Sequence, residues 1–345
     1  MHDLTQGRIA VTGGAGFIGS ALVWALNRRG IDEILIVDRL DTSEKWKNLV
    51  PLRFRDYEDA DDFLARLCGR SNTPADISTV LHLGACSSTT ETDAAFLMQN
   101  NYEYTKQLAR WAVASNVRFV YASSAATYGA RERDLRDDGD LDELRPLNMY
   151  AYSKHRFDLY ARDEGLLDRI TGIKYFNIFG PNEHHKGEMR SLVDKAYGQI
   201  RESGSIRLFK SHRCEYRDGE QQRDFLYVKD AVAMTLHLAE AGAFGLYNVG
   251  SGMPHTWLDL VRPIFRAMDV PERIEFIDMP PSLRDKYQYC TCATIDRLRA
   301  SGYAAPITPL ADAVQDYVRG YLIPDRRLDP ADDARAQASL SASIK

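Results

Sequence analysis

A tyrosine and a lysine in the middle of the chain have the residue types and the spacing of a proton-transfer pair. Tyr150 and Lys154 stand four residues apart in the segment MYAYSK, and on a helix this spacing puts both side chains on one face. A lysine ammonium beside a phenol favours the phenolate and lowers the pKa of the phenol toward working pH. Ser124 ends the segment RFVYASS, and its hydroxyl would hold the substrate oxygen that Tyr150 deprotonates. The tyrosine–lysine spacing alone is common, but with Ser124 and the glycine-rich turn described next it predicts acid–base catalysis.

A glycine-rich turn near the N-terminus has the pattern of a dinucleotide-binding site. The turn holds four glycines, Gly13, Gly14, Gly16 and Gly19. They lie between a predicted strand and a helix that starts near Phe17, where free backbone N–H groups and the positive end of the helix dipole would face a pyrophosphate. Asp38 follows 19 residues after Gly19, at the end of the next predicted strand, EILIVD, where an acid binds the ribose hydroxyls.

The residues around Asp38 leave the choice between NAD and NADP open. Asp38 would accept hydrogen bonds from a ribose 2′-OH, which favours NAD. Arg39 follows directly, and Lys45 and Lys47 lie in the next loop, where cations would neutralise a 2′-phosphate. From these residues alone, the two cofactors are equally expected.

The elements that must position these residues indicate an α/β fold. In the first 125 residues, short β-branched segments (RIAVTG, EILIVD, TVLHLG, RFVYASS) alternate with longer helical patterns, which is typical of βαβ units and a parallel sheet. Residues 149–165 form a predicted helix with Asn148 as its N-cap, and residues 172–180 form a buried strand. We therefore predict a Rossmann-type, doubly wound parallel sheet.

The second half of the chain predicts a smaller, mostly C-terminal α/β domain that binds the substrate. A helix is expected near 189–200, a short strand at RLF, a charged loop at 210–222, and a mixture of helices with the strand IEFIDMP over 256–320. The segments DFLYV and LYNVG are expected as strands that rejoin the first sheet. The expected domains are 1–180 with 223–252 for the dinucleotide, 181–222 with 253–322 for the substrate, and a mobile tail at 323–345.

Composition and charge exclude several classes of protein. Of 345 residues, 44% are apolar and 27% charged, which is ordinary for a globular protein and excludes a mostly disordered or coiled-coil chain. The formal net charge of −5 makes non-specific binding to nucleic acid unexpected. We find no apolar stretch long enough for a membrane span and no secretory signal pattern, so we expect a cytoplasmic protein whose five cysteines are reduced. His184 and His185 have no spaced partners, so no metal site is expected.

Six further segments identify the chain with a known family. LHLGACSSTTETD, NNYEYTKQL, YASSAATYG, LNMYAYSKHRFD, YFNIFGPNEHHKGEM and QQRDFLYV resemble segments of the extended short-chain dehydrogenase/reductases, a family that includes nucleotide-sugar epimerases and dehydratases. The resemblance covers about residues 7–322. Its most specific parts, ACSSTTE and HKGEM, imply an epimerase that acts at C6 of an ADP-linked heptose, a lipopolysaccharide inner-core precursor. The implied mechanism is transient oxidation to a 6-keto intermediate with bound NADP, and the implied assembly is a homo-oligomer, expected to be a pentamer.

The resemblance also implies roles for individual residues. Tyr150 and Lys186 would be the two proton acceptors, with Lys154 between Tyr150 and the nicotinamide ribose and Ser124 at the reacting oxygen. The residues implied for the cofactor are Gly13, Gly16, Phe17, Ile18, Gly19, Asp38, Arg39, Lys45, Leu83, Gly84, Ala85, Cys86, Ser87, Asn100, Lys154, Ile178 and Lys186. The residues implied for the sugar nucleotide are Ser124, Asn177, Glu188, Lys195, Phe209, Lys210, Ser211, His212, Arg223 and Tyr287. The family pattern favours NADP over NAD.

Three other functions compete with this one. A UDP-sugar 4-epimerase of the same superfamily is the nearest. A 4,6-dehydratase is disfavoured because Ala125, Ala126 and Thr127, which follow Ser124, include no carboxylate to help eliminate water. A non-catalytic regulator that senses the dinucleotide could lose the serine, tyrosine and lysine, whereas this chain keeps all three.

Overall fold

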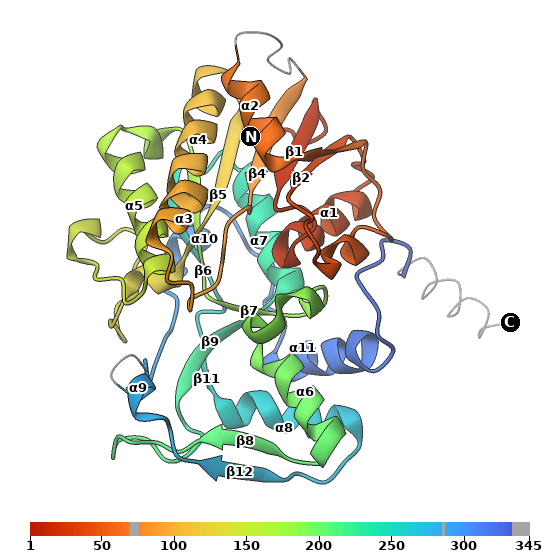
Figure 1. Cartoon of the computed structure of the whole chain (residues 1–345), viewed down its shortest axis with the longest axis vertical. Helices are drawn as coiled ribbons and strands as arrows, with labels where there is room; N and C mark the ends of the chain where they lie inside the picture. Colours follow the sequence, from red (N-terminus) through yellow and green to blue (C-terminus); the bar gives the residue numbers. More distant parts are fainter. Residues whose placement is uncertain (70–75, 285–286, 333–345) are drawn as a thin grey trace, which may run out of the picture.

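The largest element of the fold is a seven-stranded parallel sheet in the order β10-β6-β5-β4-β1-β2-β3 (Figure 1). The computed structural model describes residues 1–69, 76–284 and 287–332. The strands are β1 (Arg8–Thr12), β2 (Ile34–Asp38), β3 (Asp56–Asp59), β4 (Ile77–His82), β5 (Arg118–Ser124), β6 (Thr171–Tyr175) and β10 (Gly245–Val249). The chain order reverses between β1 and β4, which is the switch point where doubly wound sheets bind their ligands. The predicted Rossmann-type sheet is confirmed.

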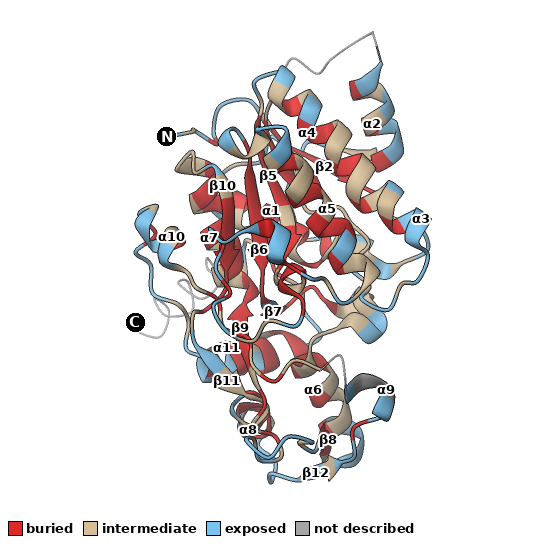
Figure 2. Ribbon diagram, turned by 90° about the vertical axis from the view of Figure 1, so that its left-hand side faces the viewer, coloured by how far each residue is buried: buried red, intermediate tan, exposed pale blue. Residues whose placement is uncertain are grey.

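Helices cover both faces of this sheet, so its central strands are buried on both sides (Figure 2). One core cluster contains residues of α1 (Phe17–Arg28) and α7 (Val228–Glu240). The other contains residues of α2 (Ala60–Cys68), α4 (Tyr104–Ala114) and α5 (Met149–Asp163). Because both faces are covered, β2 reads as a continuous apolar run ending in the acid Asp38.

Shorter helical elements connect these layers. They are η1 (Glu44–Asn48), α3 (Ala94–Leu97), η2 (Met98–Glu103), η3 (Ala125–Tyr128), η4 (Leu141–Glu143), η5 (Leu166–Asp168), η6 (His184–Met189), α9 (Pro281–Arg284), α10 (Asp296–Ala300), α11 (Leu310–Tyr317) and η7 (Val318–Leu322). The π-helical turn η2 joins α3 to α4, so the three form one continuous helical segment.

The smaller domain lies at the lower end of the molecule in Figure 1. It contains α6 (Leu192–Ser203), α8 (Trp257–Met268) and the parallel pair β8 (Ile206–Phe209) and β12 (Ile274–Ile277). A three-stranded sheet in the order β11-β9-β7 lies between the two domains. Its strands are β7 (Asn177–Phe179), β9 (Gln222–Tyr227) and β11 (Pro254–Thr256).

One strand prediction is wrong and another needs division. LYNVG forms β10 and joins the large sheet beside β6 as predicted, whereas DFLYV lies in β9, which pairs with β7 and β11 instead. The predicted strand 172–180 divides into β6 and β7 around Phe176. After this break the chain leaves the large sheet, and β9 pairs with β7 in the three-stranded sheet rather than with β6 in the large one. An apolar strand pattern identifies a strand but not its neighbour, which is why the sequence misassigned β9.

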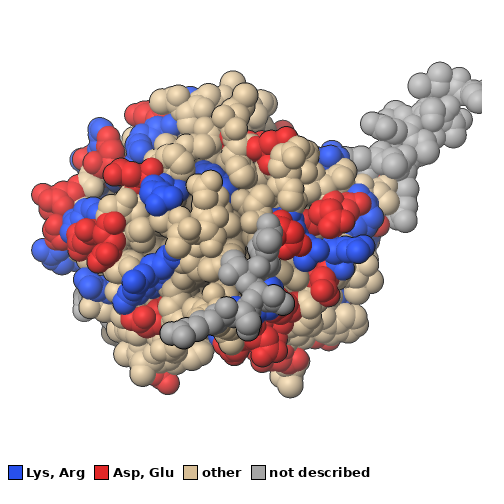
Figure 3. Space-filling model, turned by 90° about the horizontal axis from the view of Figure 1, so that it is seen from above, with Lys and Arg blue, Asp and Glu red and all other residues tan. Residues whose placement is uncertain are grey.

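The first part of the predicted tail packs onto the protein. Leu328 is fully buried, and its backbone N–H donates to Asn182 Oδ1 at 3.0 Å. Residues 333–345 of the predicted tail lie outside the described residues. On the face that Figure 3 shows, basic and acidic side chains lie interspersed. Within the described ranges, no helix is long and apolar enough to cross a membrane.

Candidate active site

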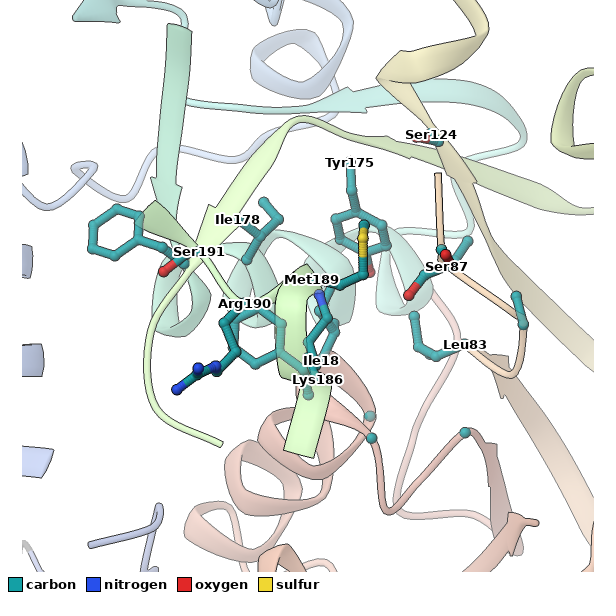
Figure 4. Close-up of a pocket in the computed structure, with 18 of the residues that line it drawn as sticks. Ile18, Leu83, Ser87, Ser124, Tyr175, Ile178, Lys186, Met189, Arg190 and Ser191 are labelled. Carbon is teal, nitrogen blue, oxygen red and sulfur yellow. The ribbon is translucent and has the colours of Figure 1, made fainter. Parts of the chain in front are cut away.

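The site lies at the carboxyl ends of β1, β2, β4 and β5, on the side of the sheet that faces the smaller domain. A cavity of about 760 Å³ opens there (Figure 4). Eighteen residues expected from the sequence line it: Gly13, Gly16, Phe17, Ile18, Gly19, Asp38, Lys45, Leu83, Gly84, Ala85, Cys86, Ser87, Ser124, Tyr150, Lys154, Asn177, Ile178 and Lys186. A second cavity, of about 600 Å³, shares the glycine turn and Asp38 with the first and is also lined by Arg39 and Asn100.

The glycine turn is too tightly packed for side chains at three of its positions, Gly13, Gly14 and Gly19. An added Cβ at Gly13, which has φ +66°, would lie 2.7 Å from the backbone nitrogen of Gly84. At Gly19 the Cβ would lie 2.0 Å from the Gly13 carbonyl oxygen. Helix α1 begins at Phe17 as predicted, and no side chain caps its first turn. The turn therefore leaves backbone N–H groups free for an anion, as a pyrophosphate requires.

The acid at the end of β2 is held from two sides. Asp38 is buried; its Oδ2 accepts from the Ala15 backbone N–H at 2.9 Å and its Oδ1 from Lys45 Nζ at 2.8 Å. The lysine therefore sits at the carboxylate that would meet the adenosine ribose. These contacts and the glycine cradle fit a dinucleotide across the two cavities.

Arg39 forms the neighbouring charged contact, in the second cavity. Its guanidinium donates to both carboxylate oxygens of Asp61, at 3.0 and 2.5 Å, and to Asn100 Oδ1 at 2.6 Å. It also lies over the Tyr104 ring, 5.8 Å from its centroid. Arg39 is thus fixed in place before any ligand is considered, and Asp61 takes up part of its charge.

Helix α5 carries Tyr150 and Lys154. Asn148 is its N-cap, as predicted, and the Asn148 side chain accepts from the Ala151 N–H at 2.8 Å. Lys154 is buried and its Nζ donates to the Ala122 carbonyl oxygen at 2.8 Å. Burial lowers the pKa of Lys154 to about 8, although the carboxylate of Asp158 opposes the change. Lys154 therefore stays mostly protonated at pH 7 but loses its proton more readily than an exposed lysine does.

Tyr150 differs from the sequence-based expectation. Burial raises the pKa of its phenol, and a hydrogen bond with Ser124 only partly offsets that increase. The expected lowering by Lys154 is absent from these contributions, and the ammonium instead donates to the carbonyl of Ala122. Tyr150, Ser124 and Lys154 line the same cavity, as the sequence predicts, but burial rather than a neighbouring charge decides the direction of the pKa change at Tyr150.

Lys186 lines the same cavity from the turn η6 (Figure 4). Its ammonium lies over the Phe17 ring, 5.3 Å from the centroid. Burial lowers the pKa of Lys186, and the carboxylate of Glu183 opposes this. The cavity is thus lined by two side chains that can exchange a proton, Tyr150 and Lys186, on separate elements.

The other expected sugar-nucleotide residues line neither of these two cavities. They are Glu188, Lys195, Phe209, Lys210, Ser211, His212, Arg223 and Tyr287. Glu188 and Lys195 form an exposed ion pair of 3.4 Å. Lys210 pairs with Asp278 at 3.1 Å.

Arg223 is the most enclosed member of this group. It is buried, and its guanidinium lies over the rings of Trp257 and Tyr287, at 5.6 and 5.1 Å from their centroids. Trp257 Nε1 donates to the Tyr287 hydroxyl at 2.8 Å. His212 Nδ1 and the Tyr289 hydroxyl are 2.7 Å apart. An aromatic and cationic surface therefore continues from Trp257, which does line the large cavity.

Sequence reasoning missed several residues that line the large cavity. Among them are Tyr175, Met189, Arg190, Ser191 and Trp257. Tyr175 ends a parallel strand, which was a usable signal. Met189, Arg190 and Ser191 adjoin the HHKG segment and were within reach of it. Trp257 begins an amphipathic helix far along the chain, and no local pattern singles it out.

Comparison with known proteins places these observations in context. The sequence model of the NAD dependent epimerase/dehydratase family matches residues 9–250. The chain is 52% identical over 314 residues to the ADP-L-glycero-D-manno-heptose-6-epimerase of Nitratidesulfovibrio vulgaris strain DP4, covering 90% of this chain and 97% of that protein. It is 45% identical over 325 residues to the protein of that name from Fusobacterium nucleatum, covering 91% and 98%.

Solved structures share the fold. The ADP-L-glycero-D-manno-heptose-6-epimerase of Helicobacter pylori superposes with a TM-score of 0.77 at 24% identity, covering 93% of this chain and 98% of that one. A UDP-N-acetylglucosamine 4-epimerase from Methanobrevibacter ruminantium superposes with a TM-score of 0.78 at 22% identity, covering 94% and 100%.

Proposed function

The chain belongs to the NAD dependent epimerase/dehydratase family, and on that premise we propose that it inverts C6 of the heptose in ADP-D-glycero-β-D-manno-heptose to give ADP-L-glycero-β-D-manno-heptose. The names of relatives at 52% and 45% identity support this substrate. The observation that carries the mechanism is that Tyr150 and Lys186 line one cavity beside the glycine turn.

The chemistry of C6 explains why two proton-transfer groups are needed. The C6 hydrogen is bound to an unactivated carbinol carbon, so no side chain removes it as a proton. A nicotinamide bound beside the glycine turn would supply the redox chemistry, a hydride transfer from C6 and back with no net oxidation. Because the hydride must return to the opposite face of the 6-keto intermediate, the carbonyl oxygen moves to a second position in the pocket.

The residues of this chain divide the proton transfers between those two positions. Tyr150 exchanges the hydroxyl proton of one epimer, with Ser124 hydrogen-bonded to it and holding the same oxygen. Lys186 exchanges the proton of the other epimer. The lowered pKa of Lys186 favours this role, because a group whose pKa is closer to working pH both accepts and donates readily.

We propose NADP as the cofactor. The glycine turn would hold the pyrophosphate, and the remainder would be surrounded by Phe17, Ile18, Leu83 to Ser87, Lys154 and Ile178, which line the cavity. Lys45 at 2.8 Å from Asp38 offsets the charge of the carboxylate that would otherwise repel a 2′-phosphate, and Arg39 supplies a second cation. Mass spectrometry of the dinucleotide released from the purified protein tests this assignment, and recovery of NAD alone would contradict it.

The sugar nucleotide would extend from the cavity toward the smaller domain. Asn177 at the cavity and Arg223 beyond it are proposed contacts, the latter with the diphosphate, because a guanidinium binds phosphate oxygens in a bidentate manner. The other proposed contacts are Glu188, Lys195, Phe209, Lys210, Ser211, His212 and Tyr287. Of these, Tyr287 adjoins the aromatic surface around Trp257.

NMR of product formation tests the proposed reaction. With substrate deuterated at C6, the label should remain on C6 of the product, and the Tyr150→Phe variant should lose about 10² to 10⁴ in kcat. Loss of the label to bulk water would contradict hydride return. Epimerisation of a UDP-hexose at C4, with no action on the ADP-heptose, would instead identify a 4-epimerase, and turnover of neither sugar nucleotide would favour a cofactor-sensing regulator.

We also propose that the protein acts in the cytoplasm, as a homo-oligomer, in making a lipopolysaccharide inner-core precursor. All five cysteines are free thiols, which fits a reducing compartment. Light scattering on the purified protein tests the expected pentamer, and a monomeric mass would contradict it.

A further inference from the structure

The segment that carries Lys186 needs something to hold it in place. It connects β7 to α6 through the short turn η6, in which Gly187 has φ +52°. Among the described residues no strand pairs with η6, and the backbone hydrogen bonds of η6 are local, such as that from the Lys186 N–H to the Glu183 carbonyl oxygen at 2.9 Å. The position of the Lys186 ammonium therefore depends on what fixes the two ends of this segment.

Glu183 joins those two ends. Its carboxylate is almost fully buried, at 1% exposure. One oxygen accepts from the Ser191 backbone N–H at 2.5 Å, and the other accepts from the Ser191 hydroxyl at 2.6 Å. Ser191 is also the N-cap of α6. The side chain of Glu183 thus closes residues 183–191 into a ring that contains Lys186.

A third element ties the ring to the body of the protein. The hydroxyl of Tyr317, which ends α11 and is fully buried, donates to Glu183 Oε1 at 3.0 Å and lies 3.4 Å from Asp194 Oδ2. Asp194 in turn pairs with Arg190 at 2.7 Å. Two buried carboxylates therefore share one phenol, but Asp194 has a cation of its own nearby, and Glu183 has none among its hydrogen-bond partners.

Lys186 lies three residues from Glu183, within the ring that this carboxylate closes. The Glu183 carboxylate is the charge that raises the pKa of Lys186 against the effect of burial. Burial raises the pKa of Glu183, and the two hydrogen bonds from Ser191 and the charge of Lys186 only partly offset this increase. The carboxylate accepts three hydrogen bonds, two from Ser191 and one from Tyr317, which favour its ionised form.

The other titratable groups around η6 leave this pairing in place. Burial lowers the pKa of His185 to about 4, and the positive charges of Lys186 and Lys45 contribute to this decrease. The imidazole of His185 is therefore uncharged at neutral pH. His184 is directed to Asp325, with 3.7 Å between their charged atoms, and burial lowers its pKa as well.

We propose that Glu183 is a positioning residue for Lys186: its carboxylate closes the segment that carries the lysine and provides the counter-charge of the ammonium. This inference rests on the proposed role of Lys186 in proton transfer. It assigns to Glu183 a function that hydrogen bonding to Ser191 alone would not require, because a neutral side chain of the same shape would also fill the space.

Glu183→Gln tests the charge while keeping the size of the side chain. Asp194→Asn is the matched control, because it neutralises the other buried carboxylate that contacts Tyr317. Competitive labelling of lysines with trace acetic anhydride across a pH series, read by mass spectrometry of the Lys186 peptide, measures the pKa of Lys186. We expect that pKa to fall by about one pH unit in Glu183→Gln and by less than about 0.3 in Asp194→Asn.

Activity then shows whether the change reaches the chemistry. The limb of the pH–kcat profile that belongs to Lys186 should move to lower pH in Glu183→Gln by the same amount, whereas a purely structural role would lower kcat equally at all pH values. If the protein lacks the proposed epimerase activity, the labelling experiment still measures Lys186, so the two failures are distinguishable. An unchanged Lys186 pKa in Glu183→Gln would overturn the proposal.

A second variant covers the case in which Glu183→Gln does not fold. Ser191→Ala keeps the carboxylate and removes one of its hydrogen bonds. A looser ring should raise the labelling rate of Lys186 at every pH while leaving its pKa unchanged. An unchanged labelling rate in Ser191→Ala would count against the closing role of Glu183.

Discussion

Replacement of Lys174 by methionine should destabilise the protein strongly. Lys174 on β6 and Asp158 on α5 form an ion pair of 2.8 Å whose side chains are 1% and 0% exposed. Asp158 also accepts from the hydroxyls of Tyr121 and Ser123, at 2.8 and 2.7 Å, and Lys174 donates to the Thr127 hydroxyl at 2.6 Å. The pair thus connects β5, β6, η3 and α5.

The size of the effect follows from the burial of the remaining charge. Methionine fills most of the space of the lysine, so the cost arises from leaving the carboxylate of Asp158 without its cation. Breaking a buried pair in this way costs about 3 to 5 kcal/mol. Because domains are stable by about 5 to 15 kcal/mol, Lys174→Met should lose a large part of the free energy of unfolding.

Urea unfolding followed by circular dichroism measures this loss. Lys47→Met is the matched control, because it removes the same charge from the exposed Lys47–Glu44 pair, with 2.7 Å between the charged atoms. That change should cost less than about 1 kcal/mol. A loss below about 1 kcal/mol in Lys174→Met as well would refute the argument that the buried carboxylate depends on its cation.

Three further outcomes are expected. In Gly19→Ala the new Cβ would lie 2.0 Å from the Gly13 carbonyl oxygen, so calorimetric titration should show NADP binding weakened about tenfold or more. The control Gly198→Ala, whose Cβ meets no atom within 4 Å, should bind NADP normally. Equal affinities of the two variants would contradict the tight packing of the turn. Burial lowers the pKa of His82 to about 3, so below pH 6.5 His82 takes up a proton in the unfolded chain but not in the folded protein. The free energy of unfolding should therefore fall by about 1.4 kcal/mol per pH unit as the pH drops through this window. His82→Gln should reduce that slope in acid unfolding curves, and an unaltered slope would exclude His82 as its source. In Arg223→Lys, loss of the proposed bidentate phosphate contact should raise KM for the ADP-sugar about tenfold with kcat nearly unchanged. Steady-state kinetics measure both constants, and a fall in kcat alone would contradict a binding role for Arg223.

Local physics explains which features were visible in the sequence. The glycine turn, the start of α1 at Phe17, the acid Asp38 and the cap at Asn148 each depend on a few neighbouring residues, and each lies where it was predicted. A parallel sheet followed from the alternation of buried strands and amphipathic helices, because each element must bury its apolar side against the next.

Contacts between distant segments explain what the sequence could not settle. The partner of β9, the direction of the pKa change at Tyr150 and the place of Trp257 in the cavity depend on what packs around each of them, and no spacing records this.

The sequence by itself predicted the glycine turn and the places of Tyr150, Lys154 and Ser124 on their own elements, because helix periodicity and strand ends fix side chains relative to the element that carries them. Only the tertiary structure placed Lys186 in the same cavity as Tyr150 and joined Glu183 to Ser191 and Tyr317. The reason is physical: burial and the field of distant charges decide where a proton resides, and both exist only once remote segments have packed together.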